Sequence, residues 1–281
     1  MKMNSEIKTI FRNDLIELVN QLNDYVATED GQWTIKGFLD VFHNIYTIST
    51  VTKIVSKILE IHIFPKILEF ARKHDYKIVL TKHQNYYPDV SFVSAKDDTV
   101  KFAVDFKTTY RLPLAPEFCN GFTLGSHGEY FINRNSTKNI QFPYNQYAGH
   151  FCLGIIYTRA NFHEVDETRI YSLDKIGSIT SVIKDFQFFV AEKWEIASDS
   201  SGSGNTANIG SINKISDILH CSGMFKNLGE EVFDDYWMNY GKITLISEDG
   251  KPKKITKLKQ FLEYRGLDVD LINSRASRKI K

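Results

Sequence analysis

The sequence predicts an α/β protein in which helices flank a mixed β-sheet. Apolar side chains recur at helical spacing in residues 5–23 and 52–74, and β-rich runs follow at 76–81, 90–94 and 100–106. Further helical patterns lie toward the C-terminal end. A helical region, then strands, then more helices is typical of a sheet that is covered by helices.

The helices have recognisable ends. Ser5 is a candidate N-cap for the first helix and Thr52 for the second. Pro65 is expected to break or kink the second helix near its middle, because proline removes a backbone donor and clashes with the preceding turn. Two shorter helices are predicted at 213–226 and 230–240.

The central strands are predicted from their apolar patterns. Residues 96–99 form a polar turn between the runs 90–94 and 100–106, so these two strands should pair as a hairpin. Residues 150–158 are almost all apolar, as expected of a strand that is covered on both faces. Residues 198–204 are rich in Ser and Gly and are expected to form a loop.

Composition indicates a globular protein with a sizeable core. Of the 281 residues, 42% are apolar and 25% are charged, and no long apolar run exists. The first residues lack the apolar segment of a signal peptide, so we expect a cytoplasmic protein without a transmembrane helix. Cys119, Cys152 and Cys221 are far apart, so neither a zinc site nor a disulfide framework is expected.

The charge is unevenly distributed along the chain. The net charge is +1, but residues 251–281 hold ten Lys and Arg residues against three acidic ones, which leaves a net charge of about −6 on the first 250 residues. A basic end suggests a polyanionic partner, and an acidic body suggests clustered carboxylates. A solvated basic end without a ligand would show the same pattern.

A carboxylate–lysine group is the main chemical feature of the sequence. In residues 100–107 the side chains alternate, so Asp105 and Lys107 share one face of the strand while the apolar side chains share the other. Asp89 begins the paired strand, and the hairpin can bring it beside Asp105. Two neighbouring carboxylates repel each other in a low dielectric unless a cation lies between them.

A hard divalent ion would satisfy such a pair. Mg²⁺ prefers oxygen ligands, in sites with one or two carboxylates plus a substrate phosphate. There it would activate water and stabilise charge on an attacked phosphate, while Lys107 would neutralise that phosphate and help orient or deprotonate the water. The same residues would also suit an exposed hairpin with an Asp–Lys ion pair, and the pattern alone leaves both interpretations open.

The order Pro-Asp, then Asp-x-Lys, is the motif of the PD-(D/E)xK nuclease superfamily, and the flanking blocks resemble the EcoRV-like type II restriction endonucleases within it. The blocks keep their order and nearly their spacing. The first fifty and the last forty residues show no clear match. The resemblance implies a restriction-endonuclease-like α/β core and cleavage of double-stranded DNA. The blocks cover roughly residues 52–110, 121–159, 193–212 and 230–240.

By that resemblance, Asp89, Asp105 and Lys107 are the catalytic residues, and Glu60 is an accessory acidic group near the metal. Asp89, Asp105 and Glu60 would then be the metal ligands, with Mg²⁺ as the cofactor. Lys53 corresponds to a basic residue near the scissile phosphate. Judged by their own neighbours, Glu60 and Lys53 could equally be solvent-facing helix residues.

The segment after residue 201 corresponds to a loop that contacts bases in the major groove. Its glycines would let the backbone approach base edges closely, Asn205 would contact adenine, and the methyl group of Thr206 would pack on a thymine methyl. A dinucleotide-binding pattern is excluded, because no helix opens there and no suitable acidic residue follows. On residue types alone, a flexible surface linker would look the same. The implied residues are Gly202, Ser203, Gly204, Asn205, Thr206 and Asn208.

Other segments would hold the DNA in place. Gln84 and Asn85 resemble a minor-groove contact, although the neighbouring Lys82 and His83 depart partly from the family. Phosphate contacts position a duplex without identifying its bases. Such contacts are implied for Thr108, Thr109, Ser136 and Lys138.

The resemblance also implies a symmetric homodimer, since two equivalent active sites cut the two strands of a palindrome. The target would be GATATC, cut bluntly at the central TA step, which is easily unstacked. Ala207 replaces a threonine of the relative, which leaves any role of this position in DNA contact undecided. A cognate DNA methyltransferase is expected in the same cell.

We therefore expect a single endonuclease domain over residues 1–281. Residues 50–160 would be the catalytic core, 161–245 the DNA-recognition part with a loop at 198–210, and 246–281 a basic C-terminal extension. Two alternatives are a repair or junction-resolving nuclease of the same superfamily and a non-catalytic DNA-binding relative. The first would usually lack the base-reading loop, and the second would be expected to have lost a catalytic residue.

Overall fold

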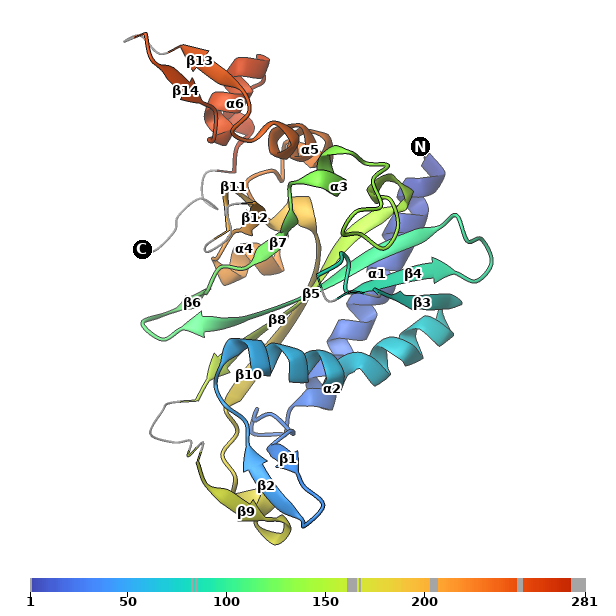
Figure 1. The fold of residues 1–281 in the computed structure, drawn as a ribbon, viewed down its shortest axis with the longest axis vertical. Coiled ribbons are helices and arrows are strands. Elements are labelled where there is room, and N and C mark those ends of the chain that lie inside the picture. Colours follow the sequence, from blue (N-terminus) through green and yellow to red (C-terminus); the bar gives the residue numbers. More distant parts are fainter. Residues whose placement is uncertain are drawn as a thin grey trace.

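The computed structural model describes residues 2–81, 83, 85–160, 166, 168–202, 207–246 and 250–273, with side chains from residue 5. A mixed six-stranded sheet forms its centre, in the order β10-β8-β5-β4-β3, with β6 paired to β5 (Figure 1). Strands β5 and β8 are parallel and the other neighbours are antiparallel, which confirms the predicted mixed sheet. The strands are β3 (Tyr76–Leu80), β4 (Val90–Ser94), β5 (Lys101–Leu112), β6 (Ala115–Cys119), β8 (Gly149–Arg159) and β10 (Ile183–Glu192).

Two long N-terminal helices cover one face of this sheet and share a core with it. At its centre the ring of Phe11 stacks on Phe102 of β5, with 4.0 Å between the ring centroids. Phe102, Val104 and Phe106 all belong to this core, which confirms the predicted alternation along β5. The opposite face of β5 is thereby left to the polar residues of the site. The helices are α1 (Lys2–Val26) and α2 (Thr52–Lys73).

A second layer covers the other face of the sheet. Its core contains fully buried aromatic side chains such as Phe225, Tyr236 and Trp237, and it includes Ala103 from β5. The polar face of β5 is therefore an interior surface. The elements of this layer are β7 (Thr123–Ser126), α3 (Glu129–Ile132), η1 (Tyr144–Gln146), η3 (Lys193–Ile196), β11 (Ala197–Ser201), β12 (Asn208–Ser211), α4 (Ile215–Leu219), α5 (Gly229–Asn239), α6 (Leu258–Arg265) and η4 (Val269–Leu271).

Two smaller units lie at opposite ends of the long axis (Figure 1). At one end β1, β2 and β9 form a three-stranded sheet, and at the other β13 and β14 form a hairpin near α6. In the described ranges no helix is both long and apolar enough to cross a membrane. The elements are β1 (Gly37–Leu39), β2 (Asn44–Thr47), β9 (Ile170–Ser172), η2 (Leu173–Ser178), β13 (Thr244–Ile246) and β14 (Pro252–Lys254).

Both predicted helix caps are wrong. Ser5 lies inside α1, which already begins at Lys2, and its carbonyl accepts a hydrogen bond from the Thr9 hydroxyl. Thr52 is the first helical residue of α2 rather than its cap, and its hydroxyl accepts a hydrogen bond from Arg159 of β8. A tertiary contact has taken the place of the local capping bond in the second case.

Three further expectations about elements are wrong in part. Helix α2 is not broken at Pro65, where the missing hydrogen bond falls on an exposed turn at Ile61. The stretch 198–204 is a loop only in part, because β11 extends to Ser201 and pairs with β12. Only Ile215–Leu219 is α-helical within 213–226.

Candidate active site

Pairing between β4 and β5 places the two carboxylates together. Val90 lies opposite Val104, so Asp89 enters the sheet directly opposite Asp105. The Asp89 carboxylate also accepts a 2.7 Å hydrogen bond from the backbone N–H of Phe106. The main chain of one strand therefore orients a side chain of the other.

Lys107 completes this group from the same face of β5. Its Nζ lies 2.6 Å from Oδ2 of Asp105, and both side chains are largely buried. The structure therefore excludes the alternative of an exposed hairpin with a surface ion pair, because Asp105 is only 6% exposed. The second layer of the fold is responsible for this burial.

The carboxylates share a hydrogen bond and influence each other strongly. Burial and the charge of Asp105 raise the pKa of Asp89 to about 7. Burial also opposes the ionisation of Asp105, but Lys107 and Lys193 outweigh it and lower the pKa of Asp105. Burial disfavours the charged form of Lys107, but the attraction of the two carboxylates outweighs it and raises the pKa of Lys107. Near neutral pH, Asp89 is thus the group that holds a proton.

Lys193, the first residue of η3, is a member of this site that the sequence analysis missed. It is 3% exposed, and its Nζ lies 3.5 Å from the ring centroid of Tyr87. Burial lowers its pKa to about 8, although Asp105 and Asp89 favour its charged form. Lys193 opens one of the blocks that resemble the family, but a single lysine without a spacing pattern gave no signal of its own.

The donor set suits a hard divalent ion at the two aspartates. A carboxyl pair that retains a proton because of burial and mutual repulsion gains from a cation between its oxygens. The third predicted ligand is not part of this group. Glu60 lies on α2 in a 2.7 Å ion pair with Lys57. Within the described ranges, no three His, Cys, Asp or Glu side chains gather closely enough to hold a metal ion.

The predicted phosphate contacts differ in accessibility. Lys53, Asn85 and Lys138 are exposed. The Thr109 hydroxyl is buried and donates to the carbonyl of Asn120, so it is not available at the surface. The Thr108 hydroxyl is hydrogen-bonded to Ser56 of α2.

The segments that carry these residues approach one another. A backbone bridge joins Tyr87 to Ile140, with Tyr87 N donating to Asn139 O at 3.1 Å. The two chain segments that lead to this bridge, one through Asn85 and the other through Lys138, therefore lie side by side. Ser136 accepts a hydrogen bond from the backbone N–H of Lys138.

Several residues of the two segments predicted to contact bases lie outside the described residues. They are Lys82 and Gln84 of the minor-groove segment, and Ser203, Gly204, Asn205 and Thr206 of the segment after residue 201. On either side of 203–206 the chain is paired, since Gly202 N donates to Asn208 O at 2.9 Å and β11 pairs with β12.

A mixed α/β sheet that carries two carboxylates and a lysine on adjacent strands has the arrangement of a PD-(D/E)xK nuclease. The model of the restriction endonuclease EcoRV family matches residues 29–266. The type II restriction enzyme EcoRV of Escherichia coli is 34% identical over 251 residues, which is 89% of this chain and 97% of that protein. The chain belongs to the EcoRV restriction endonuclease family and is a DNA-cleaving hydrolase of type II. Nucleases of this kind bind DNA and generally use divalent metal ions.

Proposed function

We propose that this enzyme is a single endonuclease domain that uses Mg²⁺ to cut both strands of GATATC bluntly at the centre. The observation that carries the proposal is the buried group of Asp89, Asp105 and Lys107 on adjacent strands. The specificity rests on the 34% identity to EcoRV and on the residue types between Gly202 and Asn208. The base contacts proposed for this segment are those of Asn205 with adenine and Thr206 with thymine.

Each residue of the group has a distinct task in the cleavage of a phosphodiester bond. Asp89, oriented by the Phe106 N–H, and Asp105, held by Lys107, would hold the Mg²⁺ ion. When bound, the ion supplies positive charge that stabilises the attacked phosphate. Asp89 must release its proton before both carboxylates are ligands. Lys107 remains charged and neutralises the phosphate from the same face.

Basic residues outside the group would position the duplex. Lys53 and Lys138 are exposed and suited to phosphate contacts, and the lysines of the 246–281 extension would grip flanking phosphates. Such an enzyme would work in the cytoplasm together with a methyltransferase that protects the same site in the host DNA.

Digestion of a plasmid with one GATATC site tests this proposal. With Mg²⁺, we expect a single linear product whose sequenced ends are blunt and divide the site between T and A. A plasmid that differs only by a GATATC→GATTTC change should stay intact, and so should the original plasmid in EDTA. Random nicking, or cutting at a different sequence, would contradict the proposed specificity.

The homodimer is supported by an apolar patch at the β1–β2–β9 end of the molecule. Phe42 is 81% exposed there, in the turn between β1 and β2. Solvent exposure of so many large apolar side chains is unfavourable in a monomer, and a palindromic target calls for a second copy. The exposed side chains of the patch are Phe38, Leu39, Val41, Phe42, Tyr46, Ile170, Leu173 and Ile176.

Replacement of Phe42 by aspartate is expected to convert the dimer into a monomer, because a charge would be buried in the interface. Analytical ultracentrifugation measures the change, and plasmid cleavage should fall by about a hundredfold with loss of simultaneous double-strand cutting. Ile246→Asp, at the exposed β13 strand on the opposite end, is the matched control and should leave the dimer intact. A Phe42→Asp protein that still sediments as a dimer would exclude this surface.

A further inference from the structure

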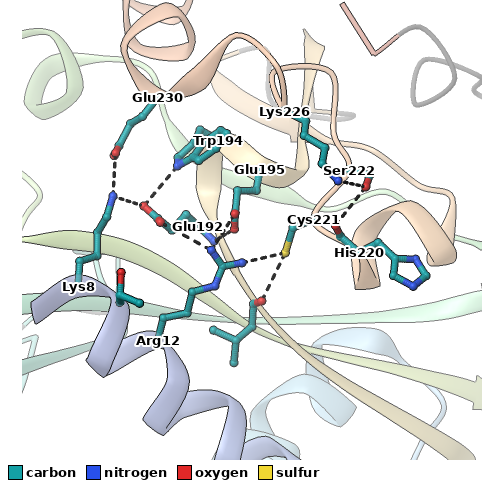
Figure 2. A network of polar contacts seen from close by, with 12 residues as sticks. Lys8, Arg12, Glu192, Trp194, Glu195, His220, Cys221, Ser222, Lys226 and Glu230 are labelled. Atoms are coloured by element: carbon teal, nitrogen blue, oxygen red, sulfur yellow. Dashed lines mark hydrogen bonds and ion pairs between the residues drawn. The ribbon is translucent and has the colours of Figure 1, made fainter. Parts of the chain in front are cut away.

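The N-terminal helix α1 is joined to the second layer by a partly buried polar network (Figure 2). Lys8 Nζ lies 2.6 Å from Glu192 and 3.0 Å from Glu230. Arg12 Nη1 lies 2.8 Å from Glu195, and its Nη2 donates to the Cys221 sulfur at 3.2 Å. Two cations of one helix thus meet three carboxylates from the end of β10, η3 and α5.

The network determines the position of η3. Glu192 precedes this short helix and Glu195 lies within it, and the Glu195 carboxylate accepts a 2.8 Å hydrogen bond from Glu192 N–H. Both carboxylates are buried, which is unfavourable without a charge partner. Burial raises the pKa of Glu192, and Lys8 opposes that rise. Arg12 and Lys8 therefore stabilise an arrangement in which both carboxylates have a charge partner.

Lys193 lies between these two glutamates in the chain, but its side chain points the other way, into the active site. Its Nζ contacts the ring of Tyr87, and Asp105 makes the largest charge contribution in favour of the charged form of Lys193. A Cβ at Gly125 would lie 3.1 Å from this ammonium, and Gly125 has a φ of +93°. The absence of a side chain at position 125 thus leaves room for the Lys193 ammonium.

When both carboxylates are ionised, the charges of the active site balance only if Lys193 is counted. Two carboxylates, Asp89 and Asp105, face two ammonium groups, Lys107 and Lys193. Without Lys193, the site with both carboxylates ionised would carry a net negative charge. Asp105 would then have Lys107 as its single charge partner. The second ammonium therefore adds to the attraction that holds the Asp105 carboxylate in its ionised form.

We infer that Lys193 is a positioning residue for Asp105, and that Arg12 and Lys8 of α1 keep it in place through Glu195 and Glu192. The inference rests on the proposed catalytic group at Asp89, Asp105 and Lys107. Helix α1 lies before the residues that match the family model, which begin at residue 29. The helix that supports the active site in this way therefore lies outside the part of the chain that the family model matches.

Lys193→Met in the full-length protein tests the inference, because it keeps the length of the side chain and removes its charge. At pH 7.5 the single-turnover cleavage rate at saturating Mg²⁺ should fall by about thirtyfold, since Asp105 loses one charge partner. Mg²⁺ binding to the free protein, measured by calorimetry, should become tighter by about fivefold, since a repelling cation is removed. If the role of Lys193 were purely structural, its replacement would weaken folding and DNA binding but would not make Mg²⁺ binding tighter.

Three further variants complete the experiment. Lys193→Arg keeps the charge and should restore Mg²⁺ affinity to within about twofold of wild type. Arg12→Ala should lower the cleavage rate by about tenfold through Glu195, with Mg²⁺ affinity shifted in the same direction as in Lys193→Met. Glu17→Gln breaks an exposed ion pair of the same helix with Lys73 and should change neither quantity.

The outcomes separate this inference from the proposed function. If Lys193→Met and Arg12→Ala both keep the wild-type rate and Mg²⁺ affinity while Asp105→Asn is inactive, the inference is overturned and the catalytic group stands. If Asp105→Asn is as active as wild type, the catalytic group itself is wrong. If Lys193→Met does not fold, the cleavage rates and Mg²⁺ affinities of Arg12→Ala and Lys193→Arg decide between these outcomes.

Discussion

Replacing Asp105 by asparagine is expected to reduce the rate of DNA cleavage by about a thousandfold or more, while DNA binding without metal stays within about threefold of wild type. Asp105 is the carboxylate that stays ionised in the buried site, because Lys107 and Lys193 lower its pKa. The asparagine has nearly the same shape but no negative charge, so it cannot hold a divalent ion with Asp89. The surfaces proposed to bind DNA lie elsewhere and are unchanged.

Single-turnover cleavage and a gel-shift titration measure the two effects separately. Asp98→Asn is the matched control, since Asp98 lies in the exposed turn of the same β4–β5 hairpin, and it should cleave like wild type. A thermal melt verifies that Asp105→Asn is folded, because loss of one partner of a buried ion pair lowers stability. Cleavage by this variant at the wild-type rate would show that the carboxylate takes no part in the reaction.

Replacing Asp89 by asparagine is expected to make the metal-free protein more stable at pH 8, by on the order of 2–4 kcal/mol, while cleavage is lost. The pKa of Asp89 is about 7 in the folded protein, against an ordinary value of 3.8. The folded state therefore binds the proton more tightly than the unfolded state. The stabilising contribution of this group is fully present below pH 3.8 and disappears as the pH rises through 7. Asparagine removes the ionised form, and its side-chain oxygen can still accept the Phe106 N–H.

Urea unfolding in EDTA at pH 5 and pH 8 tests this expectation. The wild-type protein should lose stability between these two pH values, and Asp89→Asn should lose less. Mg²⁺ should then raise the stability of the wild-type protein at pH 8 and leave that of the variant nearly unchanged. A variant that is less stable than wild type at pH 8 would mean that the two carboxylates do not repel each other in the folded protein.

Lys193 and the Lys8–Arg12 network show where prediction from sequence stopped. Each of these residues is an ordinary charged residue within its own segment, and neither α1 nor η3 contains a motif. Their partners lie far away in the chain, as in the pair of Arg12 with Glu195. The role of Glu60 rests on resemblance alone, and in the structure its carboxylate is ion-paired with Lys57.

The sequence by itself determined the mixed sheet, the β4–β5 hairpin and the shared face of Asp105 and Lys107, because these follow from alternation and turn residues within a few positions of one another. Only the tertiary structure decided that this face is buried, that Asp89 retains a proton near neutral pH, and that Lys193 adds a second buried positive charge to the site. Burial and electrostatic coupling depend on the second layer that covers the sheet. The site that began as a local pattern of two aspartates and a lysine is thus completed by residues from three other parts of the chain.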